Sequence, residues 1–195
     1  MSPAHVIEPT YLAIKQRLQS GDLAPGTRLE STKLAYDHNV SITPVRDCLH
    51  RLAGEQMVDF AHGEGFRAHL ISEAELRDML GLNLVLLQAS LADQQYEVPN
   101  TRSAREYPER LAALCLGIAR RSHNHELVTA VARLSDRLNI VRRLDTSLLG
   151  DVDAELDQIE GALTGPDAEL RDLLVRHHER RSIAAGSYVR CLAGH

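Results

Sequence analysis

A short run of residues places two hydroxyl groups and a guanidinium at the start of one predicted helix. Ser41 and Thr43 carry the hydroxyls, and Arg46 follows three residues after Thr43. Hydroxyls can donate to phosphate oxygens or base edges, and a guanidinium pairs through two hydrogen bonds with phosphate or guanine. The chemistry that suits these residues is therefore recognition of a nucleic acid.

Two short helices joined by a tight turn would position these groups, and residues 34–52 have the pattern of such a pair. Asn39 stands where the turn needs a positive φ, which Asn tolerates better than most residues. Ala35 is small where two helices approach, and Pro44 falls in the first turn of the second helix, where a missing N–H costs little. The apolar residues that pack the helices together are Val40, Val45 and Leu49. This pattern predicts a helix-turn-helix whose second helix lies in the DNA major groove.

A β-hairpin is predicted directly after the second helix. Residues 58–61 and 66–69 have the composition of short strands, and His62, Gly63, Glu64 and Gly65 between them supply the glycines of a turn. A hairpin in this place makes a winged helix, whose tip would approach the minor groove or the DNA backbone.

The segment before the helix-turn-helix is predicted to be one helix and one turn. Residues 8–19 form the helix, and residues 23–29, punctuated by Pro25 and Gly26, form the turn. Ser31 or Thr32 is then expected to cap the helix that carries residues 33–38.

Composition limits the classes of function. The 195 residues carry a formal net charge of −5, and residues 1–70 hold seven Lys or Arg and eight Asp or Glu, a net charge of −1. DNA affinity must therefore come from local placement of basic side chains. The three cysteines are widely spaced and match no zinc or disulfide framework, and no segment resembles a membrane span or signal peptide. A cytoplasmic protein with no membrane partner is expected.

The second half of the chain is predicted to be an all-helical domain. Ser72 and Glu75 have the spacing of a capping box, which places the domain boundary so that residues 1–72 form the winged helix and residues 73–195 the helical part. Helices are expected over residues 73–96, 105–122, 125–144, 152–163 and 167–192. The apolar stripe of Leu82, Val85, Leu86 and Ala89, and a second stripe over residues 127–141, are interpreted as the core of an antiparallel bundle. A subunit interface is the alternative.

At this point the sequence resembles the GntR family of bacterial transcription regulators. The matching positions lie in residues 20–30, 34–35, 40–41, 43–46, 49, 51–52 and 63. The resemblance implies a DNA operator as partner, a homodimer, and DNA contacts from Thr32, Lys33, Ser41, Ile42, Thr43, Arg46, His62 and Gly63. For Arg46 the alternative is a surface salt bridge with Asp47 or Glu55, for Ser41 a helix cap, and for the wing residues a plain turn. The family often has arginine where Ile42 stands, and some members have one at Thr32, so we expect an altered operator.

The helical part resembles the FCD-type effector domain of that family, mainly through residues 118–124, 159–163 and 173–177. Such domains usually hold a metal with one Asp and three His, and those four positions fall here on Leu111, Cys115, Leu156 and His177. We therefore expect an effector pocket at these residues without a structural divalent metal and without any other cofactor.

The remaining histidines and arginines leave several interpretations open. His123, His125, His177 and His178 are expected to be surface residues rather than metal ligands, although a lone His177 would suit a hydrogen-bonded lining position. A carboxylate effector would need arginine in place of the metal, and the helix over residues 125–144 offers Arg133, Arg137, Arg142 and Arg143. Solvated faces are the default for such charges, and an apolar effector, or none, fits the leucine-rich pocket better.

Three classes of function agree with the sequence to different degrees. A homodimeric DNA-binding regulator, acting as a repressor under effector control, ranks first. A ligand-independent regulator with a vestigial pocket is the alternative. An enzyme is not expected, because phosphate loops and nucleophile elbows are absent and nothing orients Cys115 and His177 as a catalytic pair.

Overall fold

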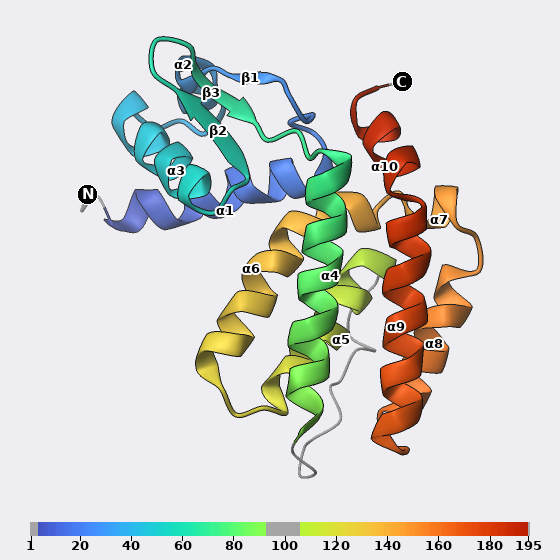
Figure 1. Cartoon of the computed structure of the whole chain (residues 1–195). Coiled ribbons are helices and arrows are strands. Elements are labelled where there is room, and N and C mark those ends of the chain that lie inside the picture. The colour runs from blue at the N-terminus through green and yellow to red at the C-terminus, as the bar shows by residue number, and fades with distance from the viewer. Residues whose placement is uncertain (1–3, 93–105, 195) are drawn as a thin grey trace. The chain divides into compact units, whose positions relative to one another are not determined.

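Helices make up most of the chain in the computed structural model, which describes residues 4–92 and 106–194 (Figure 1). The chain divides into two units, one ending at Ile71 and the other spanning Ser72–Cys191. A winged helix-turn-helix followed by antiparallel helices confirms the predicted fold class. Among the described helices, none is long and apolar enough to cross a membrane.

The first unit is built on three helices around one apolar core. They are α1 (Ala4–Ser20), α2 (Ser31–Asp37) and α3 (Ile42–Gly54), and both α1 and α2 pack on α3. Ile14 of α1 and Val45, Leu49 and Leu52 of α3 are completely buried in that core. Burying side chains of this size stabilises the unit by roughly 1.5–3 kcal/mol each, which fixes α3 on its support.

A three-stranded antiparallel sheet completes the first unit. The strands β1 (Arg28–Leu29), β2 (Val58–Ala61) and β3 (Gly65–Ala68) lie in the order β1-β3-β2. Strand β3 begins one residue earlier than predicted, because Gly65 already pairs with Ala61. Strand β1 was predicted as part of a turn, since two residues are too few to show an alternating pattern.

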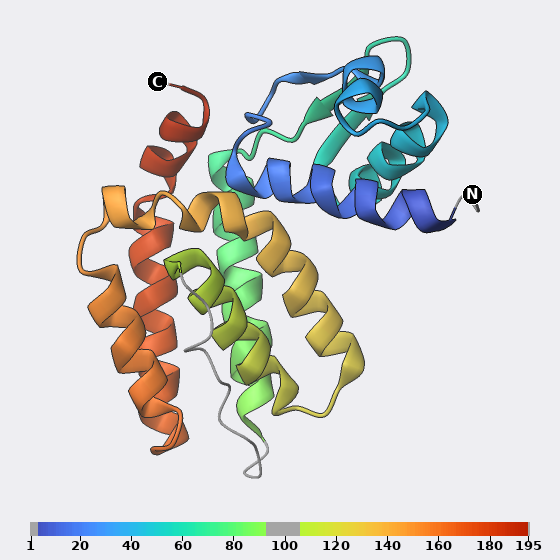
Figure 2. The ribbon, with the colours of Figure 1, turned by 180° about the vertical axis from the view of Figure 1, so that it is seen from behind.

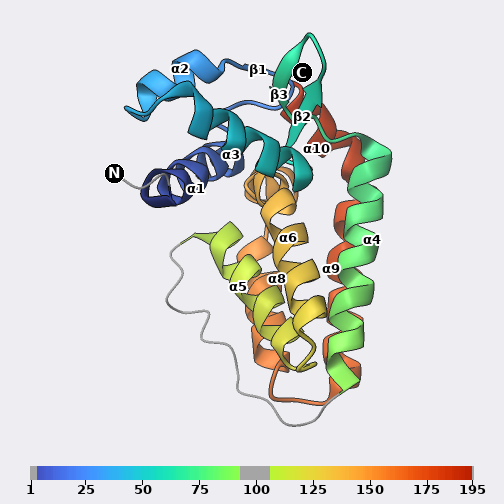
Figure 3. The same ribbon diagram turned by 90° about the vertical axis from the view of Figure 1, so that its left-hand side faces the viewer.

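The described residues of the second unit form helices and one short 3-10 turn. Its elements are α4 (Glu73–Ala89), the turn Ser90–Ala92, α5 (Tyr107–Arg120), α6 (His125–Arg142), α7 (Asp145–Leu148), α8 (Val152–Ala162), α9 (Asp167–Ile183) and α10 (Ala185–Leu192). Helix α4 runs beside α9 (Figure 1), α8 also packs on α9 (Figure 2), and α5 packs along α6 (Figure 3). Their shared core includes Leu87, Leu114, Ile118 and Leu170.

Several predicted helix boundaries in this unit were wrong. The helix predicted over residues 167–192 is interrupted at Ala184, and the short α7 was not predicted. Residues 93–96 and 105, which two predicted helices included, lie outside the described residues. The predicted capping box is confirmed, since the Oγ of Ser72 accepts from the backbone N–H of Glu75 at 3.2 Å and the backbone N–H of Ser72 donates to the Glu75 carboxylate at 3.4 Å.

The stripe on α4 does not lie wholly in the core. Leu82 is 53% exposed and Val85 is 60% exposed, whereas Leu80 and Leu87 on other sides of the same helix are buried. The core interpretation is therefore wrong for Leu82, Val85 and Ala89, which is exposed as well, because the apolar side chains of α4 extend beyond the face of this helix that is buried.

Candidate nucleic-acid interface and a buried polar cluster

The turn between α2 and α3 has the predicted geometry. Asn39 adopts a φ of 53°, in the left-handed region, and the N–H of Val40 donates to the carbonyl of Ala35 at 3.0 Å. A left-handed residue reverses the chain within a few residues, which a β-branched side chain at this point would resist. The turn therefore sets the direction in which α3 leaves α2.

The first turn of α3 presents its side chains to solvent. Ser41 is the N-cap in an extended conformation, but its hydroxyl makes no hydrogen bond to the helix, so it remains available. Ile42 and Thr43 are exposed as well, and Ile42 is an apolar side chain left 45% exposed.

The N-cap of α2 is Glu30, so the prediction that Ser31 or Thr32 caps this helix was wrong. Helix α2 begins one residue earlier than predicted.

Arg46 lies on the same exposed side of α3. It has no hydrogen bond or ion pair with any residue that the structure describes. Glu55, one of the two carboxylates in the salt-bridge alternative for Arg46, instead accepts from Tyr11 at 2.7 Å and from Lys15 at 3.1 Å. It also lies 3.5 Å from Arg51. The guanidinium of Arg46 is therefore not held by the carboxylate that could have neutralised it.

The contacts of Glu55 also hold α1 against α3. Burial would raise the pKa of the Glu55 carboxyl, but hydrogen bonds from Tyr11 and Lys15 outweigh burial and hold that pKa below its usual value. The Glu55 carboxylate stays ionised and connects the end of α3 to α1, so it helps to fix α3 against α1.

A groove separates α3 from the strands of the wing. It has a volume of about 480 Å³, and its lining includes Arg28, Thr32, Ile42, Arg46 and Phe60. Three of the predicted contact residues therefore share one depression. Arg28 lies beside them and was missed by sequence reasoning, because it fell in a segment predicted to be a turn.

The other predicted contacts lie outside that groove. Lys33 is exposed on α2, and His62 and Gly63 are exposed in the turn between β2 and β3. Gly63 has a φ of 84°, which favours glycine, so a hairpin turn accounts for this glycine by itself.

In the helical unit, the four predicted pocket positions do not form a metal site. Leu111 and Leu156 are buried in the apolar core and carry no donor atom. Cys115 accepts a weak contact from Arg142 at 3.7 Å, and the Nδ1 of His177 is engaged by Glu155 at 2.6 Å. In residues 4–92 and 106–194, no three His, Cys, Asp or Glu side chains converge as a ligand set.

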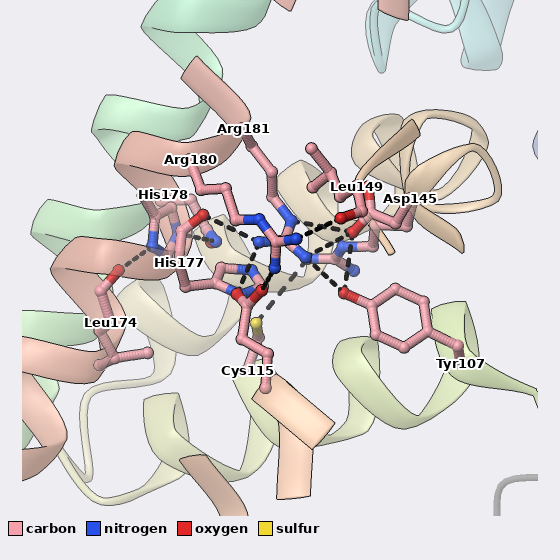
Figure 4. Close-up of polar contacts among 12 residues, drawn as sticks. Tyr107, Cys115, Asp145, Leu149, Leu174, His177, His178, Arg180 and Arg181 are labelled. Carbon is pink, nitrogen blue, oxygen red and sulfur yellow. Dashed lines mark hydrogen bonds and ion pairs between the residues drawn. The ribbon is translucent and has the colours of Figure 1, made fainter. Parts of the chain in front are cut away.

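A buried polar cluster lies beside these positions, and its members come from the helices α5, α7, α8, α9 and α10; Figure 4 shows several of them converging. We call it the Asp145 cluster. Both oxygens of Asp145, a fully buried side chain, accept hydrogen bonds: one from Tyr188 at 2.6 Å, the other from Tyr107 and from the Nε of Arg181, each at 2.8 Å. The members of the cluster are Tyr107, Asp145, Glu155, His177, Arg181 and Tyr188.

Glu155 closes the cluster on its other side. It accepts from the Nη1 of Arg181 at 2.7 Å, from His177 and from Arg180, the last two at 2.6 Å. Burial would raise the pKa of Glu155, but the hydrogen bond from His177 and the charge of Arg181 lower it to about 2. Burial and the negative charge of Asp145 raise the pKa of the Tyr107 and Tyr188 hydroxyls, so both stay protonated as donors.

His177 and His178 are buried, so the expectation that they lie at the surface was wrong. The Nδ1 of His178 donates to the carbonyl of Leu174 at 2.7 Å, so its Nε2 is the acceptor for the amide of Asn83 at 3.0 Å. Burial, and the neighbouring His177, lower the pKa of His178 to about 3, which keeps the ring neutral. On helix α9, His178 contacts Asn83 of α4 and His177 contacts Glu155 of α8, so neither is available as a surface group.

Arg142 is a buried cation of a different kind. It is 4% exposed, and its guanidinium contacts the Ser135 hydroxyl at 3.0 Å and the Cys115 sulfur at 3.7 Å. No carboxylate among the described residues forms an ion pair with it. The default expectation of a solvated arginine was therefore wrong here, and the charge lies next to one of the predicted pocket residues.

Comparison with known proteins agrees with this architecture. Residues 7–67 match the family described as bacterial regulatory proteins, gntR family. The HTH-type transcriptional regulator McbR of Escherichia coli (strain K12) is 28% identical over 145 residues, which cover 73% of this chain and 63% of McbR. The Nta operon transcriptional regulator of Aminobacter aminovorans is 27% identical over 138 residues, which cover 62% of this chain and 66% of that protein.

The chain thus spans slightly less than two thirds of the length of these curated relatives. A solved structure described as a GntR transcriptional regulator from Rhodococcus sp. RHA1 has a TM-score of 0.81 at 13% identity, covering 93% of this chain and 97% of that one, which shows a shared fold. The family match and the winged helix-turn-helix found in the same residues show that residues 7–67 belong to the gntR family of bacterial regulatory proteins.

Proposed function

We propose that this chain is a DNA-binding transcription regulator that reads its operator with the N-terminal turns of α3. The observation that carries the proposal is the exposed Arg46, which has no partner in the part of the chain that the structure describes. It lies near the exposed Ser41 and Thr43 on a helix whose opposite face is completely buried. A guanidinium in that position can pair with a guanine edge, while hydroxyls contact phosphate. The descriptions of McbR and of the Nta operon regulator as transcriptional regulators support the same role.

We further propose a homodimer that acts as a repressor in the bacterial cytoplasm, where its DNA lies. Two winged helices would bind the half-sites of a short pseudo-palindrome. The exposed Leu82 and Val85, three residues apart on one side of α4, support a second copy as the partner of that face. Repression follows where the operator overlaps a promoter, because a bound dimer excludes polymerase.

Arg46→Ala tests the DNA-binding proposal. A duplex selected by the wild-type protein from a random library, and a shuffled duplex of the same composition, are titrated by fluorescence anisotropy. Loss of one bidentate contact should cost about 1–3 kcal/mol of discrimination between the duplexes. Arg120→Ala removes an exposed charge from α5 and serves as the matched control. If no duplex is selected, or if both variants match wild type, α3 does not read DNA.

Effector control is supported by Arg142. Burying a cation is costly unless it is paired, and among the described residues this guanidinium has only a hydroxyl and a thiol as partners. We propose that a small carboxylate effector binds at Arg142 beside Cys115, without a metal.

The second candidate is a regulator without a ligand, and the Asp145 cluster favours it. There Asp145 and Glu155 already accept hydrogen bonds from Arg181, so this guanidinium is engaged by the chain's own carboxylates. Thermal unfolding against a panel of carboxylates discriminates between the two. A saturable rise in Tm that Arg142→Met abolishes supports an effector. No rise with any carboxylate supports the ligand-independent regulator.

A further inference from the structure

A row of charged side chains crosses the outer face of the sheet. The register places Arg67 of β3 directly opposite Arg28 of β1 on one side and Asp59 of β2 on the other. The next row, Leu29, Phe66 and Phe60, belongs to the opposite face, where Leu29 and Phe66 are buried. Because side chains alternate between faces along a strand, both arginines project away from the core.

No acidic side chain of the described residues neutralises these arginines. Asp59 is held instead by the Nδ1 of His69 at 2.8 Å, and within the described part of the chain Arg67 donates only to the carbonyl of Gly26, at 3.4 Å. Arg28 is exposed and has no hydrogen bond or ion pair within residues 4–92 and 106–194, not even with the nearby carboxylate of Glu30. Like charges directly opposite each other in a sheet are unfavourable, so an anion beside Arg28 and Arg67 would relieve the repulsion between them.

The position of Arg28 connects this face to the candidate recognition surface. Arg28 lines the same groove as Arg46, Thr32 and Ile42. Thr32 and Ile42 bring no positive charge to that groove. The first unit as a whole is not basic, since residues 1–70 carry a net charge of −1. Any electrostatic attraction to DNA must therefore come from the few unpaired cations near α3.

We infer that Arg28 and Arg67 form a second DNA contact, in which the outer face of the sheet binds backbone phosphates beside the groove read by α3. This inference rests on the proposed function. The two guanidiniums fit phosphate oxygens of a duplex, and they supply charge that Thr32 and Ile42 do not. The contact is independent of base sequence, because phosphates are the same at every step.

The test is the salt dependence of binding for Arg28→Ala, Arg67→Ala and the double variant. The probes are the library-selected duplex and its shuffled counterpart, titrated by anisotropy as salt rises from about 50 to about 200 mM. Removing an arginine that contacts a phosphate should reduce the steepness of the plot of log affinity against log salt concentration by about 0.9. Over this salt range, the factor by which affinity falls should therefore be about 3.5 times smaller than in wild type for each contact removed. The loss of affinity should be equal on both duplexes, and Arg28→Lys should restore most of the slope.

Arg120→Ala, which removes the same charge from the helical unit, should leave the slope unchanged, and melting curves establish that each variant is folded. A wild-type slope in the double variant overturns the inference, and the pair would then suit an acidic protein partner. Failure of the proposed function looks different, because Arg46→Ala would then retain the same discrimination between duplexes as wild type. A loss confined to the selected duplex would also overturn the inference, since it would indicate base reading.

Discussion

Replacing Asp145 with asparagine tests whether the Asp145 cluster holds the helical unit together. Asparagine keeps the shape of the side chain but removes its charge and turns one acceptor into a donor. That donor would face Tyr107, Tyr188 or Arg181, all of which now donate to the Asp145 oxygens at 2.6–2.8 Å. The site is fully buried, so water cannot take over as acceptor.

The expected magnitude follows from what Arg181 retains. Removing one partner of a buried ion pair costs about 3–5 kcal/mol, because the other charge stays buried. Glu155 remains 2.7 Å from the Nη1 of Arg181, so that charge keeps one carboxylate. We therefore expect Asp145→Asn to lower the free energy of unfolding by about 3 kcal/mol, at the lower end of that range.

Urea unfolding followed by far-UV circular dichroism measures this loss, with tyrosine fluorescence as a second signal because the chain has no tryptophan. Asp153→Asn is the control: its side chain is 66% exposed and lies 3.6 Å from Arg110, so a change within about 0.5 kcal/mol is expected. In Arg181→Met the cost of Asp145→Asn should shrink, since the stranded charge is gone. A loss below about 1 kcal/mol for Asp145→Asn in the wild-type background would refute the reasoning.

Two other predictions concern pH and assembly. The pKa of His178 is about 3 in the folded protein and 6.5 in the unfolded chain, so as the pH falls this side chain is protonated first in the unfolded chain. The contribution of His178 to stability should therefore be complete above pH 6.5 and decrease towards pH 3. His178 should contribute up to about 1.4 kcal/mol per pH unit to the slope of stability against pH, measured by urea unfolding between about pH 7 and about pH 5, and a slope in His178→Gln equal to that of wild type would contradict this assignment. Leu82→Glu should convert the proposed dimer to monomers in sedimentation velocity, and the exposed Ile183→Glu on α9 should not; a dimer that survives Leu82→Glu would rule out this face of α4.

Local signals in the sequence were sufficient for the first unit and for the start of the second. Asn39 in a left-handed conformation, the hairpin glycines and the Ser72 capping box act through neighbours a few residues away, so their effect is visible in the sequence itself. The boundary that failed nearby, the cap of α2 at Glu30, involves a backbone conformation that any residue can adopt.

The Asp145 cluster could not be predicted for the opposite reason. Its members come from α5, α7, α8, α9 and α10, and apart from His177, which was predicted as a pocket residue, no pattern in their own helices marks them as buried together. Arg181 follows a run of charged residues that is typical of a solvated face, and only the fold shows that it is 2% exposed. Which charges become buried depends on how the helices pack, and helical spacing within one segment does not record that.

The Asp145 cluster also constrains how this sequence can change over generations. Asp145 and Arg181 are each costly to lose alone, whereas joint replacement of a buried pair by apolar residues is often neutral or stabilising. A lineage could leave this arrangement only by passing through a poorly folded intermediate, or after stabilising changes elsewhere. The acid and the arginine are therefore entrenched by epistasis, and descendants should keep both or lose both together.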